Sequence, residues 1–230
     1  MFGFGGAAES EMLRAERRDL RSLLEALTDA QWETPSLCNG WTVHDIVAHI
    51  TGVSATNPGD VLRSTPHLVR GYSRLVDHGN ESFVARRRPL PHRELLAEYV
   101  EVMGLDQDAK PTRIFGRAYT RLVPSQGLAD AVIHHQDIRR PLELPRTIPA
   151  ERLVVALDRV LASRFVFHGY KRARGLQFQA TDIDLRRGAG PSVRGAAEAL
   201  LMAVSGRTAS LAELSGDGVD TLRDRIGSAA

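Results

Sequence analysis

Three residues on two predicted helices could together bind a metal ion. Asp130 and His134 stand at positions i and i+4, so a helix places the carboxylate and the imidazole on one face. His49 lies beside an apolar stripe over residues 43–50, which predicts that its ring faces the protein interior. A second histidine and a carboxylate can satisfy a buried imidazole only if a cation balances the charge. Two histidines and one acid leave a fourth position open, as in catalytic zinc sites.

Other interpretations of these residues stay open at this point. A buried histidine is often only a hydrogen-bonded core residue, and an Asp–His pair at i and i+4 is often a solvated surface contact. His44, His135 and Asp137 are also chemically competent ligands. A period of 3.6 residues places His44 and His135 on other faces of their helices. We therefore rank them below His49 and His134 as ligands. The pattern is less specific than the His-Glu-x-x-His motif.

The helix that carries His49 has clear signals at both ends. Thr42 is a suitable N-cap, and Asp45 three residues later forms an acidic variant of the capping box. The run Asn57-Pro58-Gly59 predicts the end of this helix near Ala55. Hydrophobic periodicity and proline positions predict further helices at residues 9–27, 60–77, 92–103, 125–140 and, with Pro149 as its first residue, 149–165, and a polar loop at 80–88.

The pattern changes after Gly169 and Gly175. Residues 176–180 alternate between apolar and polar side chains, which predicts a strand, and residues 183–185 are expected to pair with it. Residues 196–204 return to a helical pattern, with Gly206 as the expected C-cap. The sequence therefore predicts a mainly α protein with two domains, a helical bundle over 1–170 and a small α+β domain over 171–230. Helical bundles often build metal sites from facing helices.

Composition limits the classes of partner. The 230 residues are 43% hydrophobic and 25% charged, with a formal net charge of only +2. Basic residues are scattered and are not interleaved with aromatic residues, so we expect no nucleic-acid partner. No segment approaches the ~18 apolar residues of a membrane span, and the N-terminus lacks the pattern of a signal peptide, so we expect a cytoplasmic protein with no membrane partner. The single cysteine, Cys38, excludes an internal disulfide, and we interpret it as a small turn residue.

Two separated segments resemble a known family. Residues 34–49, which read TPSLCNGWTVHDIVAH, resemble the opening signature of the mycothiol-dependent maleylpyruvate isomerase family within the wider DinB-like group. Residues 129–142 resemble the second metal-ligand helix of that family. A third likeness, at 179–184 and 195–207, is to the small C-terminal domain of the family. The resemblance implies a DinB-like bundle of four or five helices followed by a small α+β domain.

The resemblance also implies a ligand set and a cofactor. The two histidine ligands fall on His49 and His134, and the acidic ligand falls on Asp130, where the characterised enzyme of the family has glutamate. The implied metal is zinc, with nickel as the alternative, and the implied cofactor is mycothiol. The expected partners are a small-molecule substrate and a low-molecular-weight thiol, and a monomer and a homodimer are both open.

The implied activity is isomerisation or S-transfer, and two other functions stay open. If water takes the fourth metal position in place of a thiol, the protein is a metal-dependent hydrolase or lyase. If the shorter Asp130 compromises catalysis, the protein is a helical module that only binds metal or ligand. Residues 80–91 and 104–124 are expected to provide substrate contacts.

Overall fold

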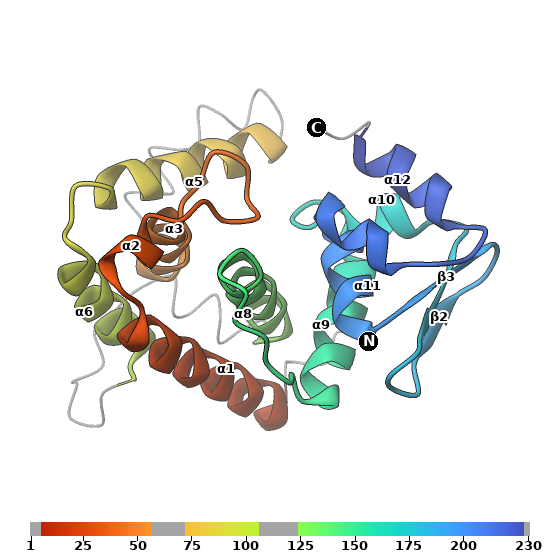
Figure 1. The fold of residues 1–230 in the computed structure, drawn as a ribbon, viewed down its shortest axis with the longest axis horizontal. Coiled ribbons are helices and arrows are strands. Elements are labelled where there is room, and N and C mark those ends of the chain that lie inside the picture. Colours follow the sequence, from red (N-terminus) through yellow and green to blue (C-terminus); the bar gives the residue numbers. More distant parts are fainter. Residues whose placement is uncertain (1–5, 57–71, 106–123, 228–230) are drawn as a thin grey trace. The chain divides into compact units, whose positions relative to one another are not determined.

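The computed structural model describes residues 6–56, 72–105 and 124–227. Most of the helix expected at 60–77 and of the segment at 104–124 lies outside these residues. The chain divides into two compact units, Met1–Pro145 and Arg146–Ala230. The predicted mainly helical architecture with a small α+β part is confirmed (Figure 1).

The first unit is a bundle of helices that centres on α3 and α8. Figure 1 shows these two helices nearly end-on, inside an arc formed by α1, α6 and α5. α3 packs against α5, α6 and α8, and α1 packs against α6 and α8. The helices of this unit, labelled as in Figure 1, are α1 (Ala7–Ala26), α2 (Asp29–Trp32), α3 (Val43–Ala55), α5 (Tyr72–Arg87), α6 (His92–Met103) and α8 (Pro124–Arg139).

The start of α3 is fixed by the predicted capping box. The Thr42 hydroxyl accepts a hydrogen bond from the Asp45 backbone N–H, and the Asp45 carboxylate accepts one from the Thr42 backbone N–H. Arg88 also donates from Nε and Nη2 to the two oxygens of Asp45, each at 3.0 Å. This pairing connects the first turn of α3 to the residue that follows α5. These hydrogen bonds at the N-terminus of α3 therefore help to fix the orientation of the helix that carries His49.

The core of the bundle is aliphatic, with two buried aromatic residues. The Tyr99 hydroxyl satisfies its hydrogen-bonding need by donating to the Arg17 carbonyl at 3.1 Å. Because this core surrounds α3 on several sides, α3 is buried along most of its length. The core residues come from α1, α2, α3, α6 and α8 and are Leu20, Leu23, Leu24, Trp32, Val43, Ile46, Val47, Ala48, Ile50, Leu95, Tyr99, Val100, Met103 and Ile138.

The prediction of a loop at residues 80–88 is wrong, because α5 continues to Arg87. Its stability comes from tertiary contacts that a polar, arginine-rich sequence does not reveal. Val84 is fully buried, and Arg87 donates to the Glu98 carboxylate on α6 from Nη2 at 2.6 Å and from Nε at 3.1 Å. These contacts outweigh the weak helical pattern of the segment.

Gly52 lets α5 approach α3 closely, and its replacement is expected to destabilise the bundle. A methyl group at Gly52 would overlap Phe83 Cβ and would lie 2.8 Å from Phe83 Cγ. We expect Gly52→Ala to lower the free energy of unfolding by about 1–3 kcal/mol, as overpacking does. Gly79→Ala is the matched control, because the nearest atom to its Cβ would be 3.8 Å away. That variant should be neutral or stabilising by up to about 1 kcal/mol, and equal losses in urea unfolding would contradict the packing argument.

The second unit packs helices against a three-stranded sheet. The strand order is β2-β1-β3, in which β1 pairs antiparallel with β2 and parallel with β3. α11 is the central helix, since it packs against α9, η1, β1 and β3. The elements are α9 (Ala150–Ala162), α10 (Gly169–Ala173), β1 (Gln177–Ala180), β2 (Arg186–Gly188), β3 (Ser192–Gly195), α11 (Ala197–Val204), the 3-10 helix η1 (Thr208–Glu213) and α12 (Val219–Gly227).

Three details of this unit differ from the sequence-based predictions. The second strand is Arg186–Gly188 and not 183–185, because residues 183–185 form a tight turn in which the Leu185 backbone N–H donates to the Ile183 carbonyl. Phe165, the last residue of the helix predicted over 149–165, is 62% exposed because α9 ends three residues earlier. Pro149 is the N-cap of α9 and not its first residue. The domain boundary expected between residues 170 and 171 stays a prediction, while the two compact units are Met1–Pro145 and Arg146–Ala230.

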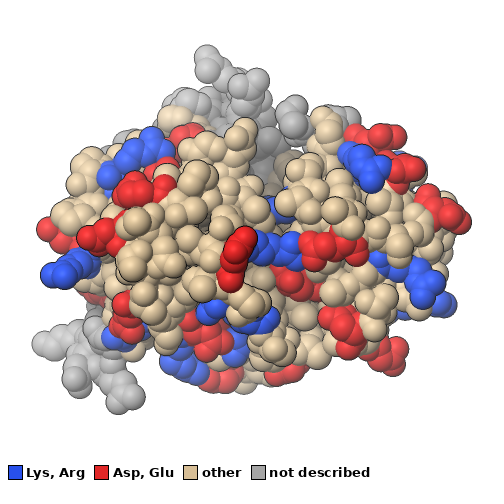
Figure 2. All heavy atoms as spheres, in the orientation of Figure 1, with Lys and Arg blue, Asp and Glu red and all other residues tan. Residues whose placement is uncertain are grey.

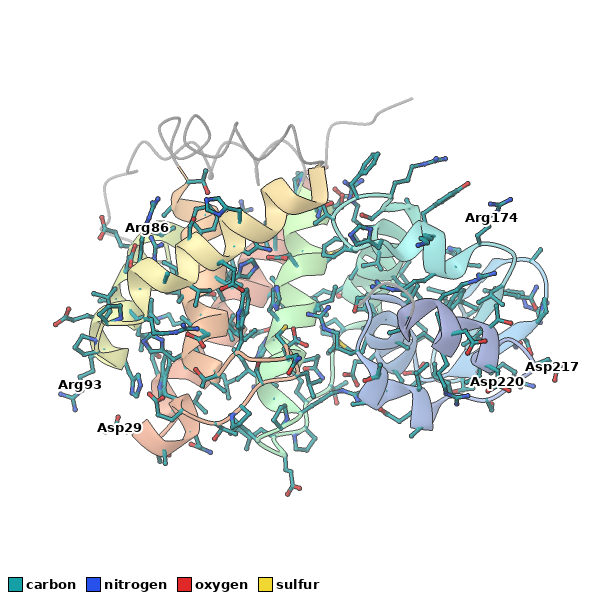
Figure 3. The ribbon with its side chains drawn as sticks, turned by 90° about the horizontal axis from the view of Figure 1, so that it is seen from above. Asp29, Arg86, Arg93, Arg174, Asp217 and Asp220 are labelled. Carbon is teal, nitrogen blue, oxygen red and sulfur yellow. The ribbon has the colours of Figure 1, made fainter. Side chains whose placement is uncertain are left out.

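Charged side chains are distributed over the visible surface without a large patch of one sign (Figure 2). Figure 3 shows Arg93 and Asp29 at the outer edge of the first unit, as expected for solvated charges. Among the residues that the structure describes, no helix combines the length and apolar character needed to cross a membrane.

Candidate metal centre

The structure brings the three candidate ligands together inside the first unit. His49 lies on α3, and Asp130 and His134 lie one turn apart on α8, which packs against α3. One potential ligand atom from each residue lies within 4.8 Å of the others. The centroids of the His49 and His134 imidazole rings are 4.9 Å apart, and the ring planes are inclined by 72°. Their role as metal ligands stays a prediction, but the required proximity is present.

The distance between His134 and Asp130 suits two ligands of one ion. His134 Nε2 and Asp130 Oδ1 are 3.6 Å apart, which is too long for a hydrogen bond. Two ligand atoms that each lie about 2.1 Å from a tetrahedral zinc ion are about 3.4 Å apart. The two side chains therefore stand at nearly the separation that a shared ion requires.

The centre is enclosed on most sides by protein. His49 and His134 are only 5% and 7% exposed. The centroids of the Trp41 and His49 rings are 5.2 Å apart. The Asp130 side chain is 28% exposed, so the carboxylate marks the side that is open to solvent. A site with buried imidazoles and one accessible side can hold an ion and admit a small ligand.

The charges around His134 favour a cation. Burial alone would lower the pKa of His134, but the charge of Asp130 and hydrogen bonds with Asp137 and Cys38 together raise this pKa to about 10. The surroundings thus stabilise positive charge at the imidazole. A divalent cation beside Nε2 would take the place of this positive charge next to the Asp130 carboxylate.

The neighbouring histidines have other partners. His44 Nε2 is 3.0 Å from the Leu90 carbonyl, so this nitrogen donates to the connection between α5 and α6. His135 Nδ1 is 2.8 Å from Glu16 Oε1 on α1, and Arg139 donates to His135 Nε2. Both rings point away from the centre, as their helix phase predicted.

Asp137 and Cys38 lie on the other side of His134. Asp137 Oδ2 is 2.8 Å from His134 Nδ1, and the Cys38 thiol donates to the same oxygen at 3.3 Å. From the sequence, Asp137 was an alternative ligand and Cys38 a turn residue. The i,i+3 spacing of His134 and Asp137 was the available signal for this contact. Of the segments expected to contact substrate, residues 80–87 are helical and 106–123 lie outside the described residues.

Comparison with known proteins gives a consistent result. A family model described as the mycothiol maleylpyruvate isomerase N-terminal domain matches residues 13–139. Two crystal structures match over 91% of this chain and 92% of theirs, each with a TM-score of 0.59 and 14% identity. They are of the mycothiol-dependent maleylpyruvate isomerase and of a variant of it with one histidine replaced by alanine. At this identity the structural likeness establishes the fold alone. No curated protein sequence matches.

Proposed function

Because the chain belongs to the mycothiol maleylpyruvate isomerase family, we propose that it is a metalloenzyme that uses a low-molecular-weight thiol to isomerise, or transfer sulfur to, a small molecule. The thiol would be mycothiol, as in the proteins of known structure that share the fold. The observation that carries the proposal is that ligand atoms of His49, Asp130 and His134 lie within 4.8 Å of one another, with Asp130 and His134 at 3.6 Å. This cluster lies within the matched region.

The donor set favours zinc. Two imidazole nitrogens and one carboxylate oxygen, with room for a fourth ligand, form the usual protein contribution to a catalytic zinc site. Nickel is the second choice, since imidazole also suits it. A bound zinc ion would supply Lewis acidity, which lowers the pKa of a coordinated thiol and favours the nucleophilic thiolate.

The chain's own residues would do three things in this site. His49 and His134 would hold the ion from two helices whose packing fixes their separation. The Trp41 ring beside His49 would keep bulk water from that side of the centre. Asp130, which is the most exposed of the three, would complete the ligand set at the side where a thiol or substrate enters.

The experiment that tests the proposal measures thiol dependence. Zinc-loaded protein is assayed with maleylpyruvate, and separately with chlorodinitrobenzene as a general electrophile, with and without mycothiol. We expect turnover only when both zinc and mycothiol are present. Turnover of ester or amide substrates without thiol would instead indicate a hydrolase with metal-bound water. Zinc binding without any turnover would indicate a non-catalytic module, and failure to bind zinc would refute the proposed centre.

A further inference from the structure

We infer that Asp137 is a positioning residue, which orients His134 for the metal, and that Cys38 holds Asp137 in place. This inference rests on the proposed function, since it concerns how the same centre is built. Asp137 is fully buried and stands one helical turn after His134 on α8. Its Oδ2 accepts a hydrogen bond from His134 Nδ1 over 2.8 Å.

The two ring nitrogens of His134 face different carboxylates, Asp137 and Asp130, at different distances. Nδ1 is within hydrogen-bonding distance of Asp137, whereas Nε2 is 3.6 Å from Asp130 and makes no hydrogen bond to it. Asp137 therefore holds the proton on Nδ1, so Nε2 is the nitrogen whose proton a metal ion would displace on binding. The arrangement matches the carboxylate–histidine–metal chains in which the outer carboxylate fixes the tautomer and the ring orientation.

The distances also decide between this role and a ligand role for Asp137. Cys38, His134 and Asp137 form a second group of potential ligand atoms within 4.8 Å of one another. At 2.8 Å, however, the His134 and Asp137 atoms are closer than the about 3.4 Å expected of two ligands around a tetrahedral zinc ion. Asp137 is also fully buried, whereas the Asp130 side chain is 28% exposed. The contact is therefore a hydrogen bond that orients the ring.

The turn at residues 36–41, just before α3, holds Asp137 by two hydrogen bonds. The Leu37 backbone N–H donates to the Asp137 carbonyl at 3.1 Å, and the Cys38 thiol donates to Asp137 Oδ2 at 3.3 Å. The Ser36 hydroxyl accepts the Cys38 backbone N–H, which sets the direction of the thiol. Gly40 permits the turn because its φ of +77° is readily adopted only by glycine.

The same turn reaches both helices of the centre. Trp41 follows Gly40 and places its ring against His49 on α3, while Cys38 contacts Asp137 on α8. The turn therefore contacts His49 through Trp41 and contacts Asp137, the hydrogen-bond partner of His134, through Cys38. We expect changes in the turn to alter metal affinity even though Cys38 and Trp41 are not ligands.

Zinc affinity tests the inference, and the chain offers a matched control. Glu16 is also a fully buried carboxylate that binds a histidine Nδ1 on α8 at 2.8 Å, but that histidine is His135, which faces away from the centre. We expect Asp137→Asn to weaken zinc binding by about 10- to 100-fold, the usual cost of losing an outer carboxylate. Glu16→Gln should lower thermal stability but leave zinc affinity within about threefold of the wild type.

Cys38 provides a milder variant at a half-buried position. We expect Cys38→Ala to weaken zinc binding by less than Asp137→Asn does, and Cys38→Ser to restore it, because serine again donates to the carboxylate. Equal zinc affinity in the wild type, Asp137→Asn and Cys38→Ala would overturn the inference. If the wild type itself bound no zinc, the proposed function would fail instead, so the two failures are distinguishable.

One measurement on the zinc-loaded wild type needs no variant. Long-range proton–nitrogen NMR correlation identifies which nitrogen of each imidazole carries the proton. The inference predicts that His134 is protonated on Nδ1, with Nε2 bound to zinc. A proton on Nε2, or zinc on Nδ1, would overturn it even if Asp137→Asn failed to fold.

Discussion

Zinc binding is expected to be lost when either histidine of the centre is replaced by alanine. His49→Ala and His134→Ala each remove one of three protein ligands, and each ligand comes from a fixed position on α3 or α8. The loss of zinc affinity should exceed about 100-fold, the upper limit for removing a residue that only hydrogen-bonds a ligand, because a direct bond to the ion disappears. Competition with a chromophoric chelator measures the affinity, and thiol-dependent turnover should fall with it.

Two nearby histidines serve as controls for this prediction. His44 lies on α3 and His135 lies on α8, but each ring points to a partner away from the centre. His44→Ala and His135→Gln should lower stability while zinc still binds at about one ion per chain. If these variants stayed folded and lost zinc as fully as His134→Ala, the ligand assignment would be contradicted.

Asp130→Asn is expected to weaken zinc binding strongly, whereas Asp130→Glu should change it little. The amide keeps the size of the side chain but removes the negative charge that balances the ion. The sequence left open whether aspartate, which is one methylene shorter than the family's glutamate, reaches the metal. Asp130 Oδ1 already lies 3.6 Å from His134 Nε2, close to the separation of two zinc ligands.

Zinc titrations of the two Asp130 variants and the wild type check this prediction. We expect Asp130→Asn to lose at least about tenfold in affinity and Asp130→Glu to stay within about tenfold of the wild type. A much tighter site in Asp130→Glu would show that the aspartate is too short to act as a full ligand. Unchanged affinity in Asp130→Asn would remove Asp130 from the ligand set.

The helices that carry the candidate ligands could be predicted because their signals are local. Thr42 and Asp45 form the capping box expected from their spacing, and α8 ends at Arg139, just before Pro141. The apolar stripe of α3 also predicted that His49 is buried. Caps, prolines and periodicity act over a few residues, so one sequence is enough to read them.

The elements that were missed depend on contacts between distant residues. The polar end of α5 is helical because Val84 is buried and Arg87 pairs with Glu98 on α6. β3 was not predicted, although Val193 is buried opposite Phe178 in the parallel pairing with β1. A four-residue strand of this kind has too short a pattern to stand out before its partner is known.

The same distinction applies to the centre. The spacing of Asp130 and His134 indicated one side of the site, and the resemblance to a family indicated that His49 completes it. The contact between Cys38 and Asp137 joins residues 99 positions apart and could not be read from either segment. The sequence therefore indicated the candidate ligands, whereas the groups that orient them became visible only in the folded chain.

X-ray absorption at the zinc edge tests the central claim most directly. The zinc-reconstituted wild type is measured alone and after addition of mycothiol. We predict about one zinc per chain, with nitrogen and oxygen neighbours at about 2.0–2.1 Å and, after addition of the thiol, one sulfur at about 2.3 Å. Absence of bound zinc, or a spectrum that mycothiol leaves unchanged, would contradict a thiol-accepting metal centre formed by His49, Asp130 and His134.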